Sequence, residues 1–190
     1  MTIKKRHSEY KHSGFEAAMR HLWAHQHRRW FQPQWNTVLF SDENRFNLSQ
    51  SDGRVRIWRA ASTRSQDPNI VEVEPFGGGS VMVWGGISAE TKTPLVVIRG
   101  NLNAECYLTE LLVPLFQNNT VSIFQQDNAH PHTARICWEY LEQNNNTVLP
   151  WPARSPDLSP IEHLWDILGR PVKAIKPPTI EILSNVLVEE

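Results

Sequence analysis

The chain has 190 residues, of which 40% are hydrophobic and 21% are charged, as expected of one globular domain with a buried core. We expect no secretion signal, because the N-terminus is basic and polar, and no apolar run approaches the ~20 residues that cross a membrane. Cys106 and Cys137 lack the spacing of metal ligands, which predicts reduced core residues of an intracellular protein.

The net charge of −1 hides an asymmetry. Residues 1–30 hold seven Lys and Arg against two Glu, a net of +5, while the remainder holds twelve against eighteen, a net of −6. We therefore treat residues 1–30 as a basic arm with a helix and residues 31–190 as the main domain. A basic arm suits contact with a phosphate backbone, although a solvated charged face explains the same charges.

The first predicted element is a helix over about 14–29, where Ser13 and Glu16 have the spacing of a capping box. Apolar residues recur there at helical intervals: Phe15, Ala18, Met19 and Leu22. Strands are predicted next, at 36–42, 45–50 and 55–58. The polar segment that follows, 59–79, reads as an insertion. Its three consecutive glycines lack the Lys and Ser/Thr of a phosphate-binding loop, so we expect a turn.

The later expected elements are, in chain order, strands at 80–87 and 95–98, a helix from about 104, a strand at 121–126, a helix at about 132–143, a strand at 147–149 and a helix from 160. Asn103 is the expected N-cap of the first of these helices, and Pro114 is expected to kink it. Ser159 is the expected N-cap of the last helix, with Pro160 at its first position.

Three carboxylates lie at the ends of these elements. Asp42 ends an early strand, Asp127 follows a later one, and Glu162 opens the last helix. Open α/β sheets place their chemistry at the carboxyl ends of strands. Each residue has an alternative role. Glu162 fits a capping box with Ser159, Asp127 can cap the turn after it, and Glu43 competes with Asp42 because strand alternation points them to opposite faces.

Four motifs resemble the catalytic domain of the mariner/Tc superfamily of cut-and-paste DNA transposases, over roughly residues 20–190. They are residues 38–43 (VLFSDE), 81–85 (VMVWG), 125–129 (QQDNA) and 151–162 (WPARSPDLSPIE). The 34 residues between Asp127 and Glu162, and the final Glu, resemble the Tc-type branch; the mariner branch proper ends in Asp. The resemblance implies an α/β, ribonuclease-H-like fold with a mixed five-stranded central sheet flanked by helices and an inserted strand pair or loop.

The resemblance further implies that Asp42, Asp127 and Glu162 are catalytic residues that hold two Mg²⁺ or Mn²⁺ ions. Grouped carboxylates repel one another, and hard cations offset this repulsion. Two such ions can stabilise both the attacking and the leaving oxygen of a phosphoryl transfer. The implied activity is strand cleavage at transposon ends and transfer into TA-containing target DNA, in the nucleus. DNA is thus the expected partner, a homodimer the candidate assembly, and neither a membrane nor a small-molecule cofactor is expected.

Four residues near this trio are candidate DNA contacts: Asn128, His130, His132 and Arg154. A turn role for Asn128 and a surface role for Arg154 explain them equally well. The two histidines, two residues apart, also suggest zinc, but no Cys or third well-spaced ligand accompanies them.

The chain departs from the family pattern at both ends. Residues ahead of position 14 are too few for the helix-turn-helix modules that read transposon ends, and the last residues read as an unfinished helix. We therefore expect a catalytic domain alone, with weak end recognition. The alternatives are a catalytically inactive or domesticated remnant, acting only as a nucleic-acid-binding or interaction domain, and a nuclease of the same fold that cuts without joining.

Overall fold

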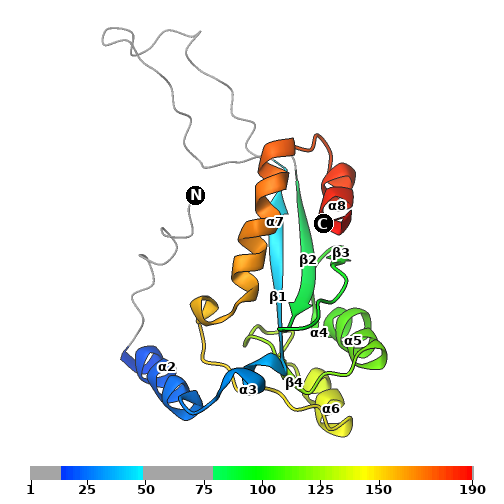
Figure 1. Ribbon diagram of the computed structural model, residues 1–190. Helices are drawn as coiled ribbons and strands as arrows, with labels where there is room; N and C mark the ends of the chain where they lie inside the picture. The colour runs from blue at the N-terminus through cyan, green and yellow to red at the C-terminus, as the bar shows by residue number, and fades with distance from the viewer. Residues whose placement is uncertain (1–13, 49–78, 190) are drawn as a thin grey trace, which may run out of the picture.

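The computed structural model describes residues 14–48 and 79–189 (Figure 1). Within these ranges four strands form one mixed sheet in the order β3-β2-β1-β4. Their bounds are β1 Val38–Asn47, β2 Ser80–Ile87, β3 Val96–Ile98 and β4 Ile123–Gln125. β2 runs antiparallel to both β1 and β3, whereas β4 runs parallel to β1. The sheet is thus mixed, and the implied α/β, ribonuclease-H-like class is confirmed.

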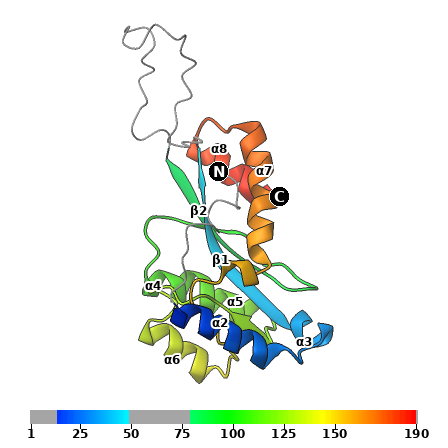
Figure 2. The ribbon, with the colours of Figure 1, turned by 90° about the vertical axis from the view of Figure 1, so that its left-hand side faces the viewer.

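The helices of the described ranges are α2 (Gly14–His27), α3 (Gln32–Asn36), α4 (Ala104–Cys106), the π-helix η2 (Tyr107–Leu112), α5 (Val113–Asn118), α6 (Arg135–Gln143), the 3-10 helix η3 (Pro156–Leu158), α7 (Ile161–Ile175) and α8 (Ile180–Glu189). Figures 1 and 2 show α7 running along β1, with α4, α5 and α6 grouped towards the end of the sheet where β4 lies. The helix predicted over 14–29 is therefore present as α2, whereas the strand predicted at 55–58 lies outside the described residues, as does most of the insertion.

β1 corrects the prediction of two separate strands at 36–42 and 45–50. It is one strand that pairs with β2 from Phe40 opposite Ile87 to Asn47 opposite Ser80. The polar run that begins at Asp42 suggested a turn. It stays in the strand because the backbone hydrogen bonds of the ladder do not depend on side-chain polarity. Asp42 consequently lies within a strand rather than at its end.

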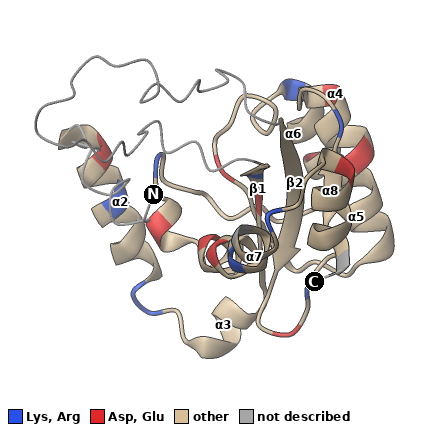
Figure 3. Ribbon diagram, turned by 90° about the horizontal axis from the view of Figure 1, so that it is seen from above, with Lys and Arg blue, Asp and Glu red and all other residues tan. Residues whose placement is uncertain are grey.

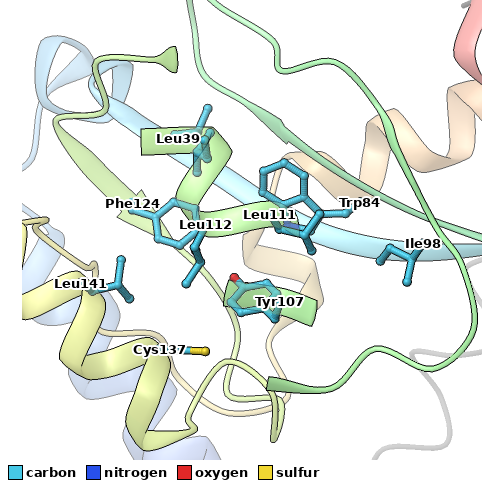
Figure 4. Packing of buried hydrophobic residues seen from close by; sticks show 10 residues of the cluster. Leu39, Trp84, Ile98, Tyr107, Leu111, Leu112, Phe124, Cys137 and Leu141 are labelled. Atoms are coloured by element: carbon cyan, nitrogen blue, oxygen red, sulfur yellow. The ribbon is translucent and has the colours of Figure 1, made fainter. Parts of the chain in front are cut away.

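The two faces of the sheet carry different cores, as strand alternation requires. Phe46, Val81 and Val83 pack with α7 and α8 on one face. The other face carries Leu39, Trp84 and Phe124 under the helices from α4 to α6 (Figure 4). Burial of this apolar surface on both sides holds the sheet between its helices.

The helix predicted from residue 104 begins as expected, with the Asn103 side chain accepting a hydrogen bond from the Cys106 amide at 2.9 Å. It continues through a π-helical segment, η2, that ends just before Pro114. Val113 donates to the carbonyl of Leu108, five residues back, as a π-helix requires. A kink was predicted at Pro114. The structure instead changes from a π-helix to an α-helix just before this residue.

The fifth strand of the implied sheet, predicted at 147–149, is a single parallel bridge between Phe124 and Val148. Two backbone hydrogen bonds of 2.8 Å flank it, from Phe124 to the carbonyl of Thr147 and from Leu149 to the carbonyl of Phe124. The position is therefore as predicted, although the pairing is too short to count as a strand.

The start of α7 differs from the prediction. The helix begins at Ile161, and Pro160 rather than Ser159 occupies the N-cap position. The Ser159 hydroxyl is buried and has no hydrogen-bond partner, so it caps nothing. Because Pro160 already adopts a helical backbone, the turn closes through backbone bonds instead, among them Glu162 to the carbonyl of Ser159.

Candidate functional site

Asp42 lies in the middle of β1 on the face that α7 covers. Trp165 of α7 donates a hydrogen bond from its indole nitrogen to Asp42 Oδ2 at 2.9 Å. Glu43 faces the opposite side, where its Oε1 lies 3.1 Å from His132 Nε2. The expected division of these two neighbours between the two faces is confirmed, and Asp42 is the one beside α7.

Burial dominates the electrostatics of Asp42. It raises the pKa of this carboxyl, and the hydrogen bond from Trp165 only partly offsets the effect. The negative charges of Glu43 and Glu162 raise the pKa further, to about 7. Asp42 therefore sits among like charges in a partly buried position, where a bound cation would stabilise its ionised form.

Asp127 follows β4, which is the parallel neighbour of β1. β4 pairs with β1 from Val38 opposite Ile123 to Phe40 opposite Gln125. Asp127 lies two residues past the end of β4, as Asp42 lies two residues past Phe40, the last β1 residue of this pairing. Ser41 closes this end of the ladder by donating its hydroxyl to the Gln125 carbonyl at 2.8 Å.

The Asp127 side chain is half exposed and makes two contacts through Oδ1. It accepts a hydrogen bond from the Ala129 amide at 2.8 Å, which is the turn-capping role expected of an Asp at this position. The same oxygen lies 2.6 Å from His132 Nδ1. Burial raises the pKa of Asp127, but His132 and the Ala129 amide outweigh it and hold the pKa below its ordinary value.

His132 joins two carboxylates on the sheet face opposite α7. Its side chain is only 2% exposed and lies between Asp127 and Glu43. Burial lowers the pKa of this imidazole, but the two carboxylates together raise it to about 10, so the ring carries a positive charge at neutral pH. The positive ring thus offsets the charge of both carboxylates.

Glu162 enters the site on the first turn of α7 and is partly buried. It lies near enough to Asp42 to raise the pKa of that carboxyl. A capping box between Ser159 and Glu162 is not formed, because the Ser159 hydroxyl makes no hydrogen bond to the helix. The structure therefore brings Glu162 close to Asp42 on the α7 face, whereas the Asp127 side chain turns to His132.

The trio is not gathered into a ready metal site. In residues 14–48 and 79–189, no three His, Cys, Asp or Glu side chains lie close enough together to hold an ion. The chemistry of the donors nevertheless fits a divalent cation, because all three are hard carboxylates, and the pKa of Asp42 is raised first by burial and then by its acidic neighbours. The third carboxylate, that of Asp127, contacts His132 instead of the other two.

The four candidate DNA contacts differ in their surroundings. Asn128 donates from its side chain to the Trp151 carbonyl at 2.9 Å. Arg154 has a left-handed backbone with φ 53°, and its guanidinium lies 3.0 Å from Glu16 Oε1. His130 is exposed on the turn after Asp127, whereas His132 is buried with both ring nitrogens next to carboxylates.

Sequence reasoning missed the role of Trp165 and the link between His132 and Glu43. Trp165 follows Glu162 by three residues, a spacing that puts both on one side of a helix, so a signal was present. Nothing local links His132 to Glu43, because 89 residues separate them. Both α2 and α7 carry acidic and basic residues (Figure 3).

Comparison with known proteins identifies the family of the chain. A family model described as DDE superfamily endonuclease matches residues 37–184. The chain belongs to this family and, within it, to the Tc/mariner type of transposase catalytic domain. The Tcb2 transposase of Caenorhabditis briggsae is 36% identical over 159 residues, which are 81% of this chain and 58% of that protein. The Tc3 transposase of Caenorhabditis elegans is 36% identical over 162 residues, 82% of this chain and 48% of its own length.

Solved structures of Mos1 mariner transposase share the fold. Its catalytic domain aligns with a TM-score of 0.62 at 22% identity, covering 95% of this chain and 82% of that one. A Mos1 paired-end complex with the left transposon end aligns with a TM-score of 0.64 at 19% identity, over 95% and 56% of the two chains. This chain thus spans about half to three fifths of the length of the curated relatives it matches.

No helix in its described part is long and apolar enough to cross a membrane.

Proposed function

We propose that the chain is the catalytic part of a Tc-type transposase, which cleaves DNA strands at transposon ends and joins them to target DNA. The observation that carries the proposal is the approach of two carboxylates from distant segments, Asp42 of β1 and Glu162 of α7, close enough for Glu162 to raise the pKa of Asp42. Asp127 follows β4, the parallel neighbour of β1, two residues after the end of that strand. The family match and the Tc relatives support it.

Asp42, Asp127 and Glu162 are the residues that would hold a divalent cation, Mg²⁺ or Mn²⁺, and we propose two ions. Mos1 catalytic-domain structures have been solved with Mg and with Mn, which supports this choice for a protein of the same fold. Bound between carboxylates, such ions supply Lewis-acid stabilisation of the oxygens of a phosphodiester. Because Asp42 has a pKa of about 7, it must lose its proton before it can act as a ligand.

The chain's own residues prepare this site in three ways. The indole of Trp165 holds Oδ2 of Asp42 at 2.9 Å and thus fixes the orientation of the carboxylate. The Ala129 amide and His132 engage Oδ1 of Asp127. The loop before α7 leads into the first turn of the helix, which carries Glu162. Partial burial of Asp42 excludes water from one side of the site, and charges interact more strongly where water is excluded.

The proposed partners are transposon-end DNA and a TA-containing target, reached in the nucleus. Mos1 has been solved with its left transposon end and in a strand transfer complex, which supports DNA as the partner here. A homodimer is the proposed assembly, since Mos1 forms paired-end complexes. Asn128, His130 and Arg154 lie on loops around the carboxylates and are the proposed contacts to DNA phosphates; His132 is buried and is better placed to act on Asp127.

Cleavage of DNA with Mn²⁺ and its dependence on Asp127 test the proposal. The parent chain and Asp127→Asn are incubated with a supercoiled plasmid that carries a Tc-type terminal repeat, with Mn²⁺ or with EDTA. We expect Mn²⁺-dependent nicking by the parent and at least a hundredfold loss in the variant, because one metal ligand is weakened. Equal nicking by both proteins would contradict the assignment of Asp127, and no nicking by the parent would favour an inactive remnant that keeps only the fold.

A further inference from the structure

The buried imidazole of His132 connects Asp127 to a carboxylate that lies outside the proposed trio. Its Nδ1 is 2.6 Å from Asp127 Oδ1, and its Nε2 is 3.1 Å from Glu43 Oε1. Glu43 lies in the middle of a ten-residue strand, so its backbone is fixed by the sheet. The two contacts therefore tie the loop that carries Asp127 to β1.

The imidazole is held in place by residues around it. The ring of Tyr107 packs against it at a tilt of 34°, with centroids 4.1 Å apart. The Tyr107 hydroxyl donates to Gln126 Oε1 at 2.7 Å, and Gln126 donates to the backbone carbonyl of His132 at 3.4 Å. Tyr107 and Gln126 are buried as well. A side chain enclosed in this way has one orientation available, which is what a positioning residue needs.

Both contacts to the Asp127 carboxylate fall on one oxygen. Oδ1 accepts from the Ala129 amide and faces His132 Nδ1, so among the described residues Oδ2 is the oxygen left for a ligand. Carboxylates that bind metals are commonly held in this way, with one oxygen bonded to the protein and the other turned to the ion.

We propose that His132, held by Glu43, is a positioning residue that orients the Asp127 carboxylate so that Oδ2 serves as its metal-binding oxygen. This proposal rests on the proposed function, since it assigns a role at the same site. His132 itself touches neither metal nor DNA. It acts through Asp127, and Glu43 acts through His132.

Substitution of His132 by Asn or by Gln removes one of its two contacts at a time. At position 132, the amide nitrogen of Asn falls near the position of Nδ1, and that of Gln near the position of Nε2. His132→Asn therefore keeps a donor towards Asp127, whereas His132→Gln keeps one only towards Glu43. A merely structural role would be impaired by both substitutions alike, so rescue by Asn and not by Gln is diagnostic.

The test is calorimetric titration of Mn²⁺ into the metal-free chain, its two His132 variants, Glu43→Gln and a control, His25→Gln, whose side chain is exposed on α2. We expect His132→Gln to bind Mn²⁺ roughly 10- to 100-fold more weakly than the parent, as for lost partners of metal ligands. His132→Asn should stay within about threefold, and Glu43→Gln should fall between the two. His25→Gln should match the parent.

Different outcomes overturn different claims. If the parent binds Mn²⁺ and His132→Gln binds it equally well, the positioning role is wrong and the proposed metal site stands. If the parent binds no Mn²⁺, the proposed function fails and the positioning role falls with it. Should His132→Gln fail to fold by circular dichroism, Glu43→Gln decides in its place, and parent-like affinity in that variant overturns the proposal.

Discussion

Arg20 on α2 forms a bidentate pair with Asp157, which lies 137 residues further along the chain in the loop before α7. Its Nη1 donates to Asp157 Oδ1 at 2.7 Å, while Nη2 donates to Oδ2. Trp23 adds a hydrogen bond from its indole to the Pro150 carbonyl at 2.6 Å. α2 is thereby fastened to the two ends of the proline-rich loop that leads to Glu162.

Replacing Arg20 should loosen that loop. We expect Arg20→Ala to lower the free energy of unfolding by about 1 kcal/mol, the upper range for a partly exposed pair with good geometry. The matched control is Arg135→Ala, which removes a pair with Glu139 one helical turn away and should cost about 0.3–0.5 kcal/mol. Urea unfolding measures both values. Faster amide exchange over residues 150–160 in Arg20→Ala alone would confirm the fastening role, and equal exchange would refute it.

Asp42 predicts how stability changes with pH in the absence of metal. Its pKa of about 7 in the folded chain exceeds its ordinary value of 3.8, so the folded state holds this proton more tightly than the unfolded state. Stability should therefore fall as pH rises from 4 to 7, by up to about 4 kcal/mol for this group, at 1.36 kcal/mol per pKa unit.

Asp42→Asn isolates this effect, because it removes the titrating group and keeps the shape. Urea unfolding in EDTA at several pH values should show the variant gaining stability relative to the parent between pH 4 and 7. A difference between the two proteins that stays constant with pH would mean that the Asp42 carboxyl has an ordinary pKa, and that it is not buried among like charges.

Gly85 and Gly169 offer a matched pair near Trp165. A Cβ on Gly85 would lie 3.0 Å from a methyl carbon of Leu95 and 3.3 Å from the indole of Trp165, closer than most side chains tolerate. Gly85→Ala should therefore push Trp165 away from Asp42 and cost roughly 1–3 kcal/mol. A Cβ on Gly169, inside α7, would meet Phe46 at an ordinary 3.7 Å, so Gly169→Ala should stabilise the helix by about 0.5–1 kcal/mol. Thermal unfolding distinguishes them, and equal shifts would contradict the packing around Trp165.

The parts of the fold that were predictable from sequence depend on local patterns. The apolar runs before Asp42 and Asp127 identify buried strands, and the Asn103 cap marks its helix, because these signals lie within a few residues. The two-strand prediction over 36–50 failed because polar residues interrupt the apolar pattern of β1, while the pairing that keeps it extended comes from β2.

The surroundings of the site could not be predicted in the same way. Burial of His132 between Asp127 and Glu43 depends on the meeting of two segments far apart in the chain, and a histidine in a polar run carries no sign of it. The apolar pattern of α2 predicted a helix, yet Phe15, Met19 and Leu22 remain exposed, because no described element covers that side of α2.

The central claim is that Asp42, Asp127 and Glu162 form one metal site. Anomalous diffraction at the manganese edge, from crystals grown with Mn²⁺, tests it most directly. We predict anomalous peaks within about 2.2 Å of oxygens from Asp42 and Asp127, with Glu162 as a further ligand, and loss of those peaks in Asp42→Asn. Manganese bound elsewhere, or the absence of any peak near these carboxylates, would contradict the account.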